Sequence, residues 1–378
     1  MIERKMGYRG SKSDSKISVK EQRVDGSRYF NPRFKYLRYT LMGFERNYPV
    51  KILSNQTNIF RRNYSIYTHK PHEVKLSLMD PWFITGFSDA ESSFSILIQH
   101  NVKHNTNWRV KVIFAIALHK KDKLLLENLQ NYWGRGKLHV HGKNSVQYRV
   151  ESIKDLQVII DHFDMYPLLT CKLADYILFK KAFNIIKDKH HLTEKGLFLL
   201  IGIKSSLNLG LNTELKQAFP NWEGYKVNRP DLVSRSIPNP NWLAGFSSGD
   251  SSFDIKISNS PSTKSGKRVQ LRFSIGLNIR EIDFIKNLLN YFKLNQVEGK
   301  SSYIYYGNNF VSLQVIKFSD IRDIIIPFFN KYPIQGVKEK DFSNFVIVAD
   351  MINKNEHLTL FGFNKISQIK AFMTEERT

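Results

Sequence analysis

Two carboxylates, Glu91 and Asp250, occupy matching places in a segment that the chain contains twice. The first copy runs from Trp82 to Phe94 and the second from Trp242 to Phe253. Carboxylate oxygens are hard ligands of the kind that Mg²⁺ prefers. A lone acid is usually a solvated or capping group, but a pair in matching contexts predicts a shared metal site.

Two lysines follow the same duplication. Each of Lys172 and Lys338 follows a Tyr-Pro pair at the same short distance along the chain. An ammonium group near a reacting centre can stabilise developing negative charge. The duplication gives both lysines equivalent places in the two halves, and one interpretation of each is a group that stabilises negative charge. The alternative for each is a basic side chain that contacts a phosphate backbone or only solvent.

The repeat extends well beyond these four residues. A His-Leu-Thr turn at 191–193 recurs at 357–359, with the same spacing between copies as the two lysines. This spacing is larger than that between the two acids, and the change falls between Trp133 and Tyr166, which predicts a longer hairpin in the second copy. The predicted organisation is a basic leader at 1–75, a first half at 76–204, a polar linker at 205–239 and a second half at 240–378.

Each half begins with the signature of a helix start. Asp80-Pro81 and Asn239-Pro240 supply a capping residue followed by a proline that fits the first helical position. Gly86 and Gly245 fall inside these helices, where glycine costs roughly 1 kcal/mol relative to alanine. The close approach of another backbone would explain both glycines. We expect the two helices to pack against each other there as pseudo-symmetric copies.

Period-two alternation follows each helix and indicates half-buried strands. Phe94, Ile96 and Ile98 fall on one face with mostly polar residues between them, and Phe253, Ile255 and Ile257 repeat this pattern. Further strands are predicted at 109–118, 137–150, 268–277 and 302–317, and further helices at 121–133, 154–163, 172–188, 281–292, 319–330 and 338–353. The fold class is α+β, with helices on one face of each antiparallel sheet and a polar, basic face left for a partner.

Charge indicates what kind of partner this is. The chain has 57 basic and 34 acidic residues, a net charge of +23, which favours a polyanion over a small neutral substrate. Nucleic acid is the first expectation and an anionic membrane surface the second. No apolar run approaches the roughly 18 residues that a membrane span requires. A single cysteine, Cys171, excludes an internal disulfide framework and a cysteine-built zinc site.

The leader is the most basic part of the chain. Residues 1–70 hold 16 basic and 5 acidic side chains and lack a sustained apolar period, so they are predicted to be mostly irregular. The segment Arg61–Ser65 resembles the arginine-before-cleavage pattern of mitochondrial presequences. Removal of the leader and retention as translated upstream sequence both stay open.

The paired motifs resemble those of the LAGLIDADG homing endonucleases, in the single-chain, two-motif form encoded in fungal mitochondrial introns. The resemblance covers residues 76–370, including both Tyr-Pro-to-Lys segments and both His-Leu-Thr turns. It implies two saddle-shaped sheets packed through the motif helices. It also implies a monomer in the mitochondrion that hydrolyses double-stranded DNA at a long, non-palindromic intron-insertion site, leaving short 3′ overhangs.

The resemblance assigns a metal site to the ends of the motif helices. It places Glu91 and Asp250, together with the adjacent Ala90 and Gly249, where they would hold Mg²⁺ against the scissile phosphates. Two carboxylates converging at negative helix ends need cations for stability. Bound metal can lower the pKa of an attacking water and neutralise charge on the leaving oxygen.

The resemblance also assigns the lysines and a DNA-reading surface. Lys172 and Lys338 match the family's active-site lysine, which stabilises charge on the phosphate or positions the attacking water. Major-groove reading by a sheet uses side chains at every second residue. The outward positions with suitable chemistry are Ser93, Ser95, Gln99, Arg109, Lys111, Lys256, Arg268, Gln270 and Arg272.

Departures from the family pattern leave two alternatives open. Family motifs usually close with glycine where this chain has Ser92 and Ser251, and a water-ordering glutamine often stands where it has Leu118 and Leu277. Serine adopts positive φ less readily than glycine, so one alternative is a cleavage-impaired DNA-binding relative. The other is an RNA maturase that assists splicing of a group I intron.

Overall fold

The computed structural model describes residues 38–41, 44–47 and 79–377, except for 233–234, 262–265 and 295–302. The chain divides into two units, Met1–Lys75 and Leu76–Thr378. In the first unit the described residues form two paired antiparallel strands, β1 (Arg38–Leu41) and β2 (Phe44–Asn47). The predicted irregular leader therefore contains a short ribbon that the sequence analysis missed. The presequence-like segment Arg61–Ser65 lies outside the described residues.

The first half of the second unit is an antiparallel sheet with helices. Its strands are paired in the order β3-β4-β6-β5. In chain order the elements are α2 (Pro81–Glu91), β3 (Ser92–His100), β4 (Trp108–His119), α3 (Lys123–Trp133), β5 (Lys137–Val140), β6 (Ser145–Val150), α4 (Ile153–Met165), α5 (Lys172–Lys187) and α6 (Glu194–Ser205). A short 3₁₀ turn, η1 (Lys120–Asp122), joins β4 to α3.

The second half repeats this order with a sheet paired as β7-β8-β10-β9. Its elements are α8 (Pro240–Asp250), β7 (Ser251–Asn259), β8 (Lys267–Asn278), η4 (Ile279–Glu281), α9 (Ile282–Tyr291), β9 (Ile304–Tyr306), β10 (Phe310–Val315), α10 (Phe318–Asp320), η5 (Ile321–Ile325), α11 (Ile326–Lys331), α12 (Lys338–Asn353) and α13 (Leu360–Arg377). The predicted α+β class with two antiparallel sheets is confirmed. None of the described helices has the length and hydropathy needed to span a membrane.

Several predicted elements have different boundaries. The segments 137–150 and 302–317 are each two short strands joined by a turn, rather than one strand. The predicted longer hairpin in the second copy is wrong, because the spacing between copies has already increased before the hairpin, where β5 begins at Lys137 and β9 at Ile304. The extra residues lie between α9 and β9. Helices α6 and α13 were not predicted.

The predicted linker packs on the first half. It contains helix α7 (Thr213–Ala218), and the side chains of Leu215 and Phe219 are buried in the core of the first half. Arg229 donates hydrogen bonds to Asp175 Oδ2 (3.1 Å) and to the Cys171 carbonyl (2.9 Å), both at the start of α5. Most of this segment is therefore part of the first half's folded body.

The capping signals have the predicted effect at both motif helices. Asp80 Oδ1 accepts a hydrogen bond from Trp82 N at 2.8 Å, and Asn239 Oδ1 accepts one from Asn241 N at 2.8 Å. These bonds satisfy amide groups that have no partner within the helix. Local residues therefore determine where α2 and α8 begin, and with it where each motif acid lies.

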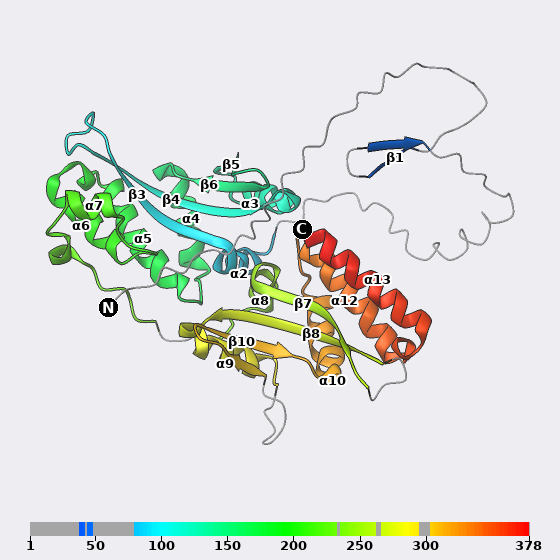
Figure 1. Cartoon of the computed structure of the whole chain (residues 1–378). Coiled ribbons are helices and arrows are strands. Elements are labelled where there is room, and N and C mark those ends of the chain that lie inside the picture. The colour runs from blue at the N-terminus through cyan, green and yellow to red at the C-terminus, as the bar shows by residue number, and fades with distance from the viewer. Residues whose placement is uncertain are drawn as a thin grey trace, which may run out of the picture. The chain divides into compact units, whose positions relative to one another are not determined.

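Helices α2 and α8 pack side by side between the two sheets (Figure 1), as the glycines predict. A Cβ added at Gly86 would lie 1.8 Å from the Trp242 carbonyl oxygen, and one at Gly245 would lie 2.0 Å from the Phe83 carbonyl oxygen. Only glycine permits so close an approach of two backbones. Both glycines therefore lie where the backbones of α2 and α8 come closest to each other.

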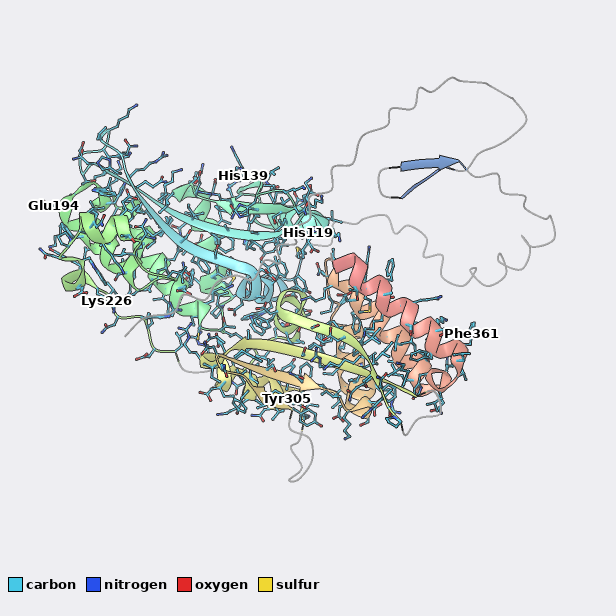
Figure 2. All side chains as sticks on the ribbon, in the orientation of Figure 1. His119, His139, Glu194, Lys226, Tyr305 and Phe361 are labelled. Atoms are coloured by element: carbon cyan, nitrogen blue, oxygen red, sulfur yellow. The ribbon has the colours of Figure 1, made fainter. Side chains whose placement is uncertain are left out.

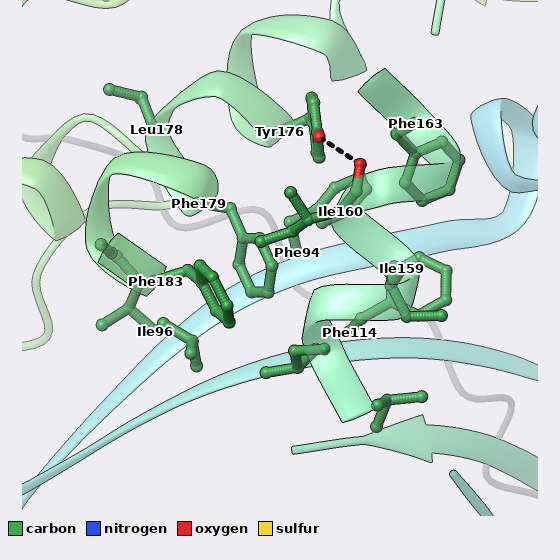
Figure 3. Close-up of a cluster of buried hydrophobic side chains, with 14 of the residues drawn as sticks. Phe94, Ile96, Phe114, Ile159, Ile160, Phe163, Tyr176, Leu178, Phe179 and Phe183 are labelled. Atoms are coloured by element: carbon green, nitrogen blue, oxygen red, sulfur yellow. Dashed lines mark hydrogen bonds between the residues drawn. The ribbon is translucent and has the colours of Figure 1, made fainter. Parts of the chain in front are cut away.

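An aromatic core fixes helices α4 and α5 to the inner face of the first sheet (Figure 3). The ring of Phe94 on β3 lies 5.7 Å from the Phe163 ring and 5.2 Å from the Phe179 ring. Phe253 makes the equivalent contacts on β7, with the Phe345 ring 5.4 Å away. Because helices cover this face of each sheet, the alternate side chains point to the opposite face.

Candidate active site and DNA interface

The two motif acids meet at the ends of the paired helices. Glu91 is the last residue of α2, and Asp250 is the last residue of α8. A Cβ added at Gly249 would lie 2.9 Å from Glu91 Cγ and 3.1 Å from Glu91 Oε1, so the Glu91 side chain rests against the end of the other helix. Glu91 and Gly249 line a cavity of about 380 Å³, together with Leu118 and Lys338.

The protein environment resists the charged form of both acids. Burial raises the pKa of Glu91, and the charge of Asp250 raises it further, while Lys338 and Lys172 oppose this shift. Burial also raises the pKa of Asp250, again against the effect of both lysines. A bound cation would relieve this penalty, because it favours the carboxylate form. The electrostatics therefore fit a metal site.

Each candidate lysine reaches the end of the motif helix in its own half. Lys172 is the first residue of α5, and its Nζ donates to the carbonyl oxygens of Ala90 (2.9 Å) and Ser88 (3.3 Å). Lys338 is the first residue of α12, and its Nζ donates to the Gly249 carbonyl oxygen. An ammonium group is well placed at the negative end of a helix. The structure thus places both lysines beside the two acids.

The protein oxygens at this site suit a metal ion that takes its remaining ligands from water or substrate. Among the described residues, no group of three or more His, Cys, Asp or Glu side chains could hold a metal ion. A cation at this site would take oxygens from Glu91, Asp250 and the backbone, and the rest from water or phosphate. Mg²⁺ normally binds in this way, through one or two carboxylates together with substrate phosphates.

Two buried polar residues, Asp89 in the first motif helix and Ser248 in the second, were not predicted from the sequence. Asp89 Oδ2 accepts hydrogen bonds from Leu169 N (2.6 Å) and Thr170 N (3.3 Å), and burial raises the pKa of Asp89 to about 6. In the second half Ser248 Oγ accepts one from Gln335 N (3.0 Å). These bonds tie each motif helix to the segment before its lysine. Their matching places in the two motifs were the available signal.

The serines that follow the acids do not strain the backbone. Ser92 has a φ of −81° and Ser251 a φ of −115°, both in the extended region. Neither position requires the positive φ that would favour glycine. Serine is therefore accommodated at both positions without backbone strain. The strain argument for a cleavage-impaired protein does not apply.

All nine predicted reading residues lie on the outer faces of the sheets, and the side chains of five of them form no ion pair or hydrogen bond with another described residue. Gln99 is paired across the sheet with Arg109, and Lys256 with Gln270, and side chains paired in this way share a face. Arg268 pairs with Ser258 on the same face as Lys256. Four of these five are exposed and Gln270 is half-buried. These side chains occupy every second position of their strands, as expected from the alternation.

The other four predicted reading residues are engaged locally. Ser93 and Ser95 donate to the carbonyl oxygens of their cross-strand partners at 3.3 and 3.4 Å. Lys111 Nζ lies 3.2 Å from Glu151 Oε2, and Arg272 Nη2 lies 2.6 Å from Asp254 Oδ2. Asp254 therefore orients Arg272 on the outer face and offsets its charge.

Outer-face residues of the third and fourth strands were missed. The strand register places Gln147 and Arg149 of β6 and His139 of β5 on the same face as Arg109. Tyr305 of β9 takes an equivalent place in the second half. Figure 2 labels His139 and Tyr305 among the side chains of the two sheets. The signal was period-two alternation within 137–150 and 302–317, which was hidden because each segment was predicted as one strand.

The fold and the paired acids define a two-motif nuclease scaffold, and comparisons with known proteins identify its family. The family model described as LAGLIDADG endonuclease matches residues 84–183 and 243–349, one segment in each half. The chain belongs to the LAGLIDADG endonuclease family, as its motifs indicate. The predicted enzyme class, an endonuclease, is confirmed.

Individual relatives agree with this assignment. "Probable intron-encoded endonuclease 3" of Neurospora crassa is 38% identical, over 97% of this chain and 70% of its own. The LAGLIDADG meganuclease I-CpaMI bound to uncleaved DNA is 58% identical with a TM-score of 0.75, over 77% of this chain and 98% of its own. I-SmaMI bound to an uncleaved DNA target in the presence of calcium ions is 37% identical with a TM-score of 0.74, over 78% and 99%.

Proposed function

We propose that this chain is a homing endonuclease that cuts double-stranded DNA at a long, non-palindromic intron-insertion site and leaves short 3′ overhangs. The observation that carries the proposal is the meeting of Glu91 and Asp250 at the ends of two packed helices, with Lys172 and Lys338 beside them. The DNA-bound meganucleases that share this fold support DNA as the substrate.

We assign separate roles to the acids and the lysines. Glu91 and Asp250, with the backbone at Ala90 and Gly249, would hold Mg²⁺, which when bound lowers the pKa of an attacking water and neutralises charge on the leaving oxygen. The related complex obtained with calcium ions supports a divalent cation. Lys172 and Lys338 place positive charge next to the acids, where it can stabilise the reacting phosphate.

The outer faces of the two sheets are the proposed DNA surface. The first half presents Gln99 and Arg109, whereas the second presents Lys256 and Arg268. Because these sets differ, one chain can read two different half-sites, and a monomer suffices. The intron-encoded relative in a fungus and the basic, presequence-like leader support a mitochondrial location.

Cleavage of DNA that spans the uninterrupted insertion site tests this proposal. We expect double-strand cleavage with Mg²⁺, no cleavage with EDTA, and binding without efficient cleavage with Ca²⁺. Cleavage that persists in EDTA would refute the metal-dependent mechanism. Tight binding to RNA of the host intron, with no cleavage of any DNA, would instead favour the maturase alternative.

Duplex binding is expected to weaken steeply as salt rises. Each phosphate neutralised by Lys or Arg contributes roughly 0.9 to the slope of log affinity against log salt concentration. Fluorescence anisotropy with a labelled cognate duplex at several KCl concentrations measures this slope. A slope near zero would contradict a basic DNA-binding surface.

Replacement of Lys256 by Ala is expected to weaken recognition of one half-site only. If Lys256 contacts a base, the loss should be about 1–3 kcal/mol for the half-site bound by the second half. Competition binding with duplexes altered in one half-site at a time measures the effect. The matched control is Lys365→Ala, an exposed lysine on α13. Equal loss on every sequence would show that Lys256 contacts phosphate.

A further inference from the structure

One carboxylate of each half forms a hydrogen bond with the other half. Its partner there is the backbone amide of the residue directly before that other half's candidate lysine. Asp122, at the end of η1 in the first half, accepts a hydrogen bond through Oδ1 from Val337 N at 2.6 Å. Glu281, at the matching end of η4 in the second half, accepts one through Oε1 from Cys171 N at 2.7 Å. The exchange is reciprocal and follows the internal repeat.

These bonds fill a gap at the start of both helices. Cys171 and Val337 are the capping positions of α5 and α12, and neither side chain caps its own helix. Amide groups at a helix start need partners from outside the helix, and a carboxylate there is favoured by the helix dipole. The carboxylate of the opposite half therefore satisfies the amide of the capping residue, and at α5 it acts beside Thr170 Oγ1, which accepts from Lys172 N at 3.2 Å.

The absence of a side chain at Gly336 leaves room for the Asp122 carboxylate beside Val337 N. Gly336 has a φ of +78°, and a Cβ added there would lie 2.6 Å from Asp122 Oδ1. A larger residue at this position would push the carboxylate away from Val337 N. Asp122 also lies near enough to Glu91 for its charge to raise the pKa of Glu91, so the contact is at the margin of the active site.

We propose that Asp122 and Glu281 are positioning residues that hold Lys338 and Lys172 in the active site from across the boundary between the halves. The inference rests on the proposed catalytic role of the two lysines. Each acid holds the residue before a lysine, and that lysine reaches the end of the motif helix in its own half. A loosened helix start would withdraw the ammonium group from the acids.

Single-turnover cleavage with Mg²⁺ tests the pairing through a double-mutant cycle. Asp122→Ala should slow cleavage about 10- to 100-fold, because misplacing a catalytic group by about 1 Å can cost that much. Asp122→Asn keeps an acceptor oxygen and should restore most of the rate. Adding Lys338→Ala to Asp122→Ala should cause no loss beyond that of Lys338→Ala alone. Adding Lys172→Ala should instead multiply the separate losses.

The reciprocal variants, at Glu281, should show the opposite pattern of coupling to the two lysines. Glu281→Ala should be coupled to Lys172→Ala and independent of Lys338→Ala, with Glu281→Gln close to wild type. Glu127→Ala, which removes an acid that pairs with Lys123 on the surface of α3, is the matched control and should leave the rate unchanged. Duplex binding and the unfolding midpoint of each variant show that folding and docking are intact.

The outcomes separate this inference from the proposed function. Coupling of each acid to the lysine of its own half, or to neither lysine, would overturn the positioning role. Equal loss in Asp122→Asn and Asp122→Ala would show that the charge of Asp122 acts directly, which also overturns it. If Lys172→Ala and Lys338→Ala cleave at the wild-type rate, the catalytic assignment itself is wrong and the inference falls with it.

Discussion

Glu91→Gln and Asp250→Asn are each expected to reduce DNA cleavage by orders of magnitude while duplex binding stays near that of the wild type. Both substitutions keep the size of the side chain and remove the charge that would hold Mg²⁺. The buried environment already disfavours that charge, since burial raises the pKa of both acids. Without a metal, binding is expected to be retained or slightly tightened, because a negative charge facing the phosphates is gone.

The measurement combines single-turnover cleavage with anisotropy on the same duplex. Each strand carries its own end label, so a variant that spares one strand reveals a nicked product and semi-independent metal positions. Glu127→Gln on α3 serves as the charge-matched control and should cut normally. If both motif variants cleave both strands at the wild-type rate, the metal must bind elsewhere on this chain.

Gly86→Ala is expected to destabilise the protein by about 3 kcal/mol or more, at the upper end of what overpacking a core costs. The added Cβ would lie 1.8 Å from the Trp242 carbonyl oxygen and 2.9 Å from Phe246 N, both on α8. Backbone cannot rotate away as a flexible side chain would. Relief therefore requires α2 and α8 to separate, which also moves Glu91 away from Asp250.

Urea unfolding of the wild type and the variant measures this loss of stability. The control is Gly224→Ala, where an added Cβ would meet no heavy atom within 4 Å beyond its own chain neighbours among the described residues. We expect that control to change the midpoint little. An unchanged midpoint for Gly86→Ala would mean that the helices do not approach as closely as described, and would weaken the basis for a shared active site.

The internal repeat explains why so much of the site was predictable. Gly86 and Glu91 are placed by the capped start of α2, and their counterparts by the capped start of α8, so local sequence determines all of these positions. The alternation in β3 and β7 then sets which side chains face outward. These features depend on neighbouring residues in the chain, which a sequence shows directly.

The missed features depend on tertiary packing or on brief turn signals. The contact of Asp122 with Val337 joins residues from two halves and has no local signature. Gly142 lies in the turn between β5 and β6 with a φ of +74°, a signal that was present but outweighed by the surrounding strand pattern. The φ values of Ser92 and Ser251 follow from how each helix passes into its strand, which residue identity alone did not determine.

The packing of the linker sets where the two halves can be recombined. Phe219 belongs to the core of the first half, and Arg229 clamps the start of α5 through Asp175 and the Cys171 carbonyl. A chimera joined at Ser205 would remove Phe219 from the core of the first half and the Arg229 contacts from the helix that carries Lys172. The natural module boundary for exchanging halves with a related enzyme therefore lies beyond Arg229, in the few residues before Asn239.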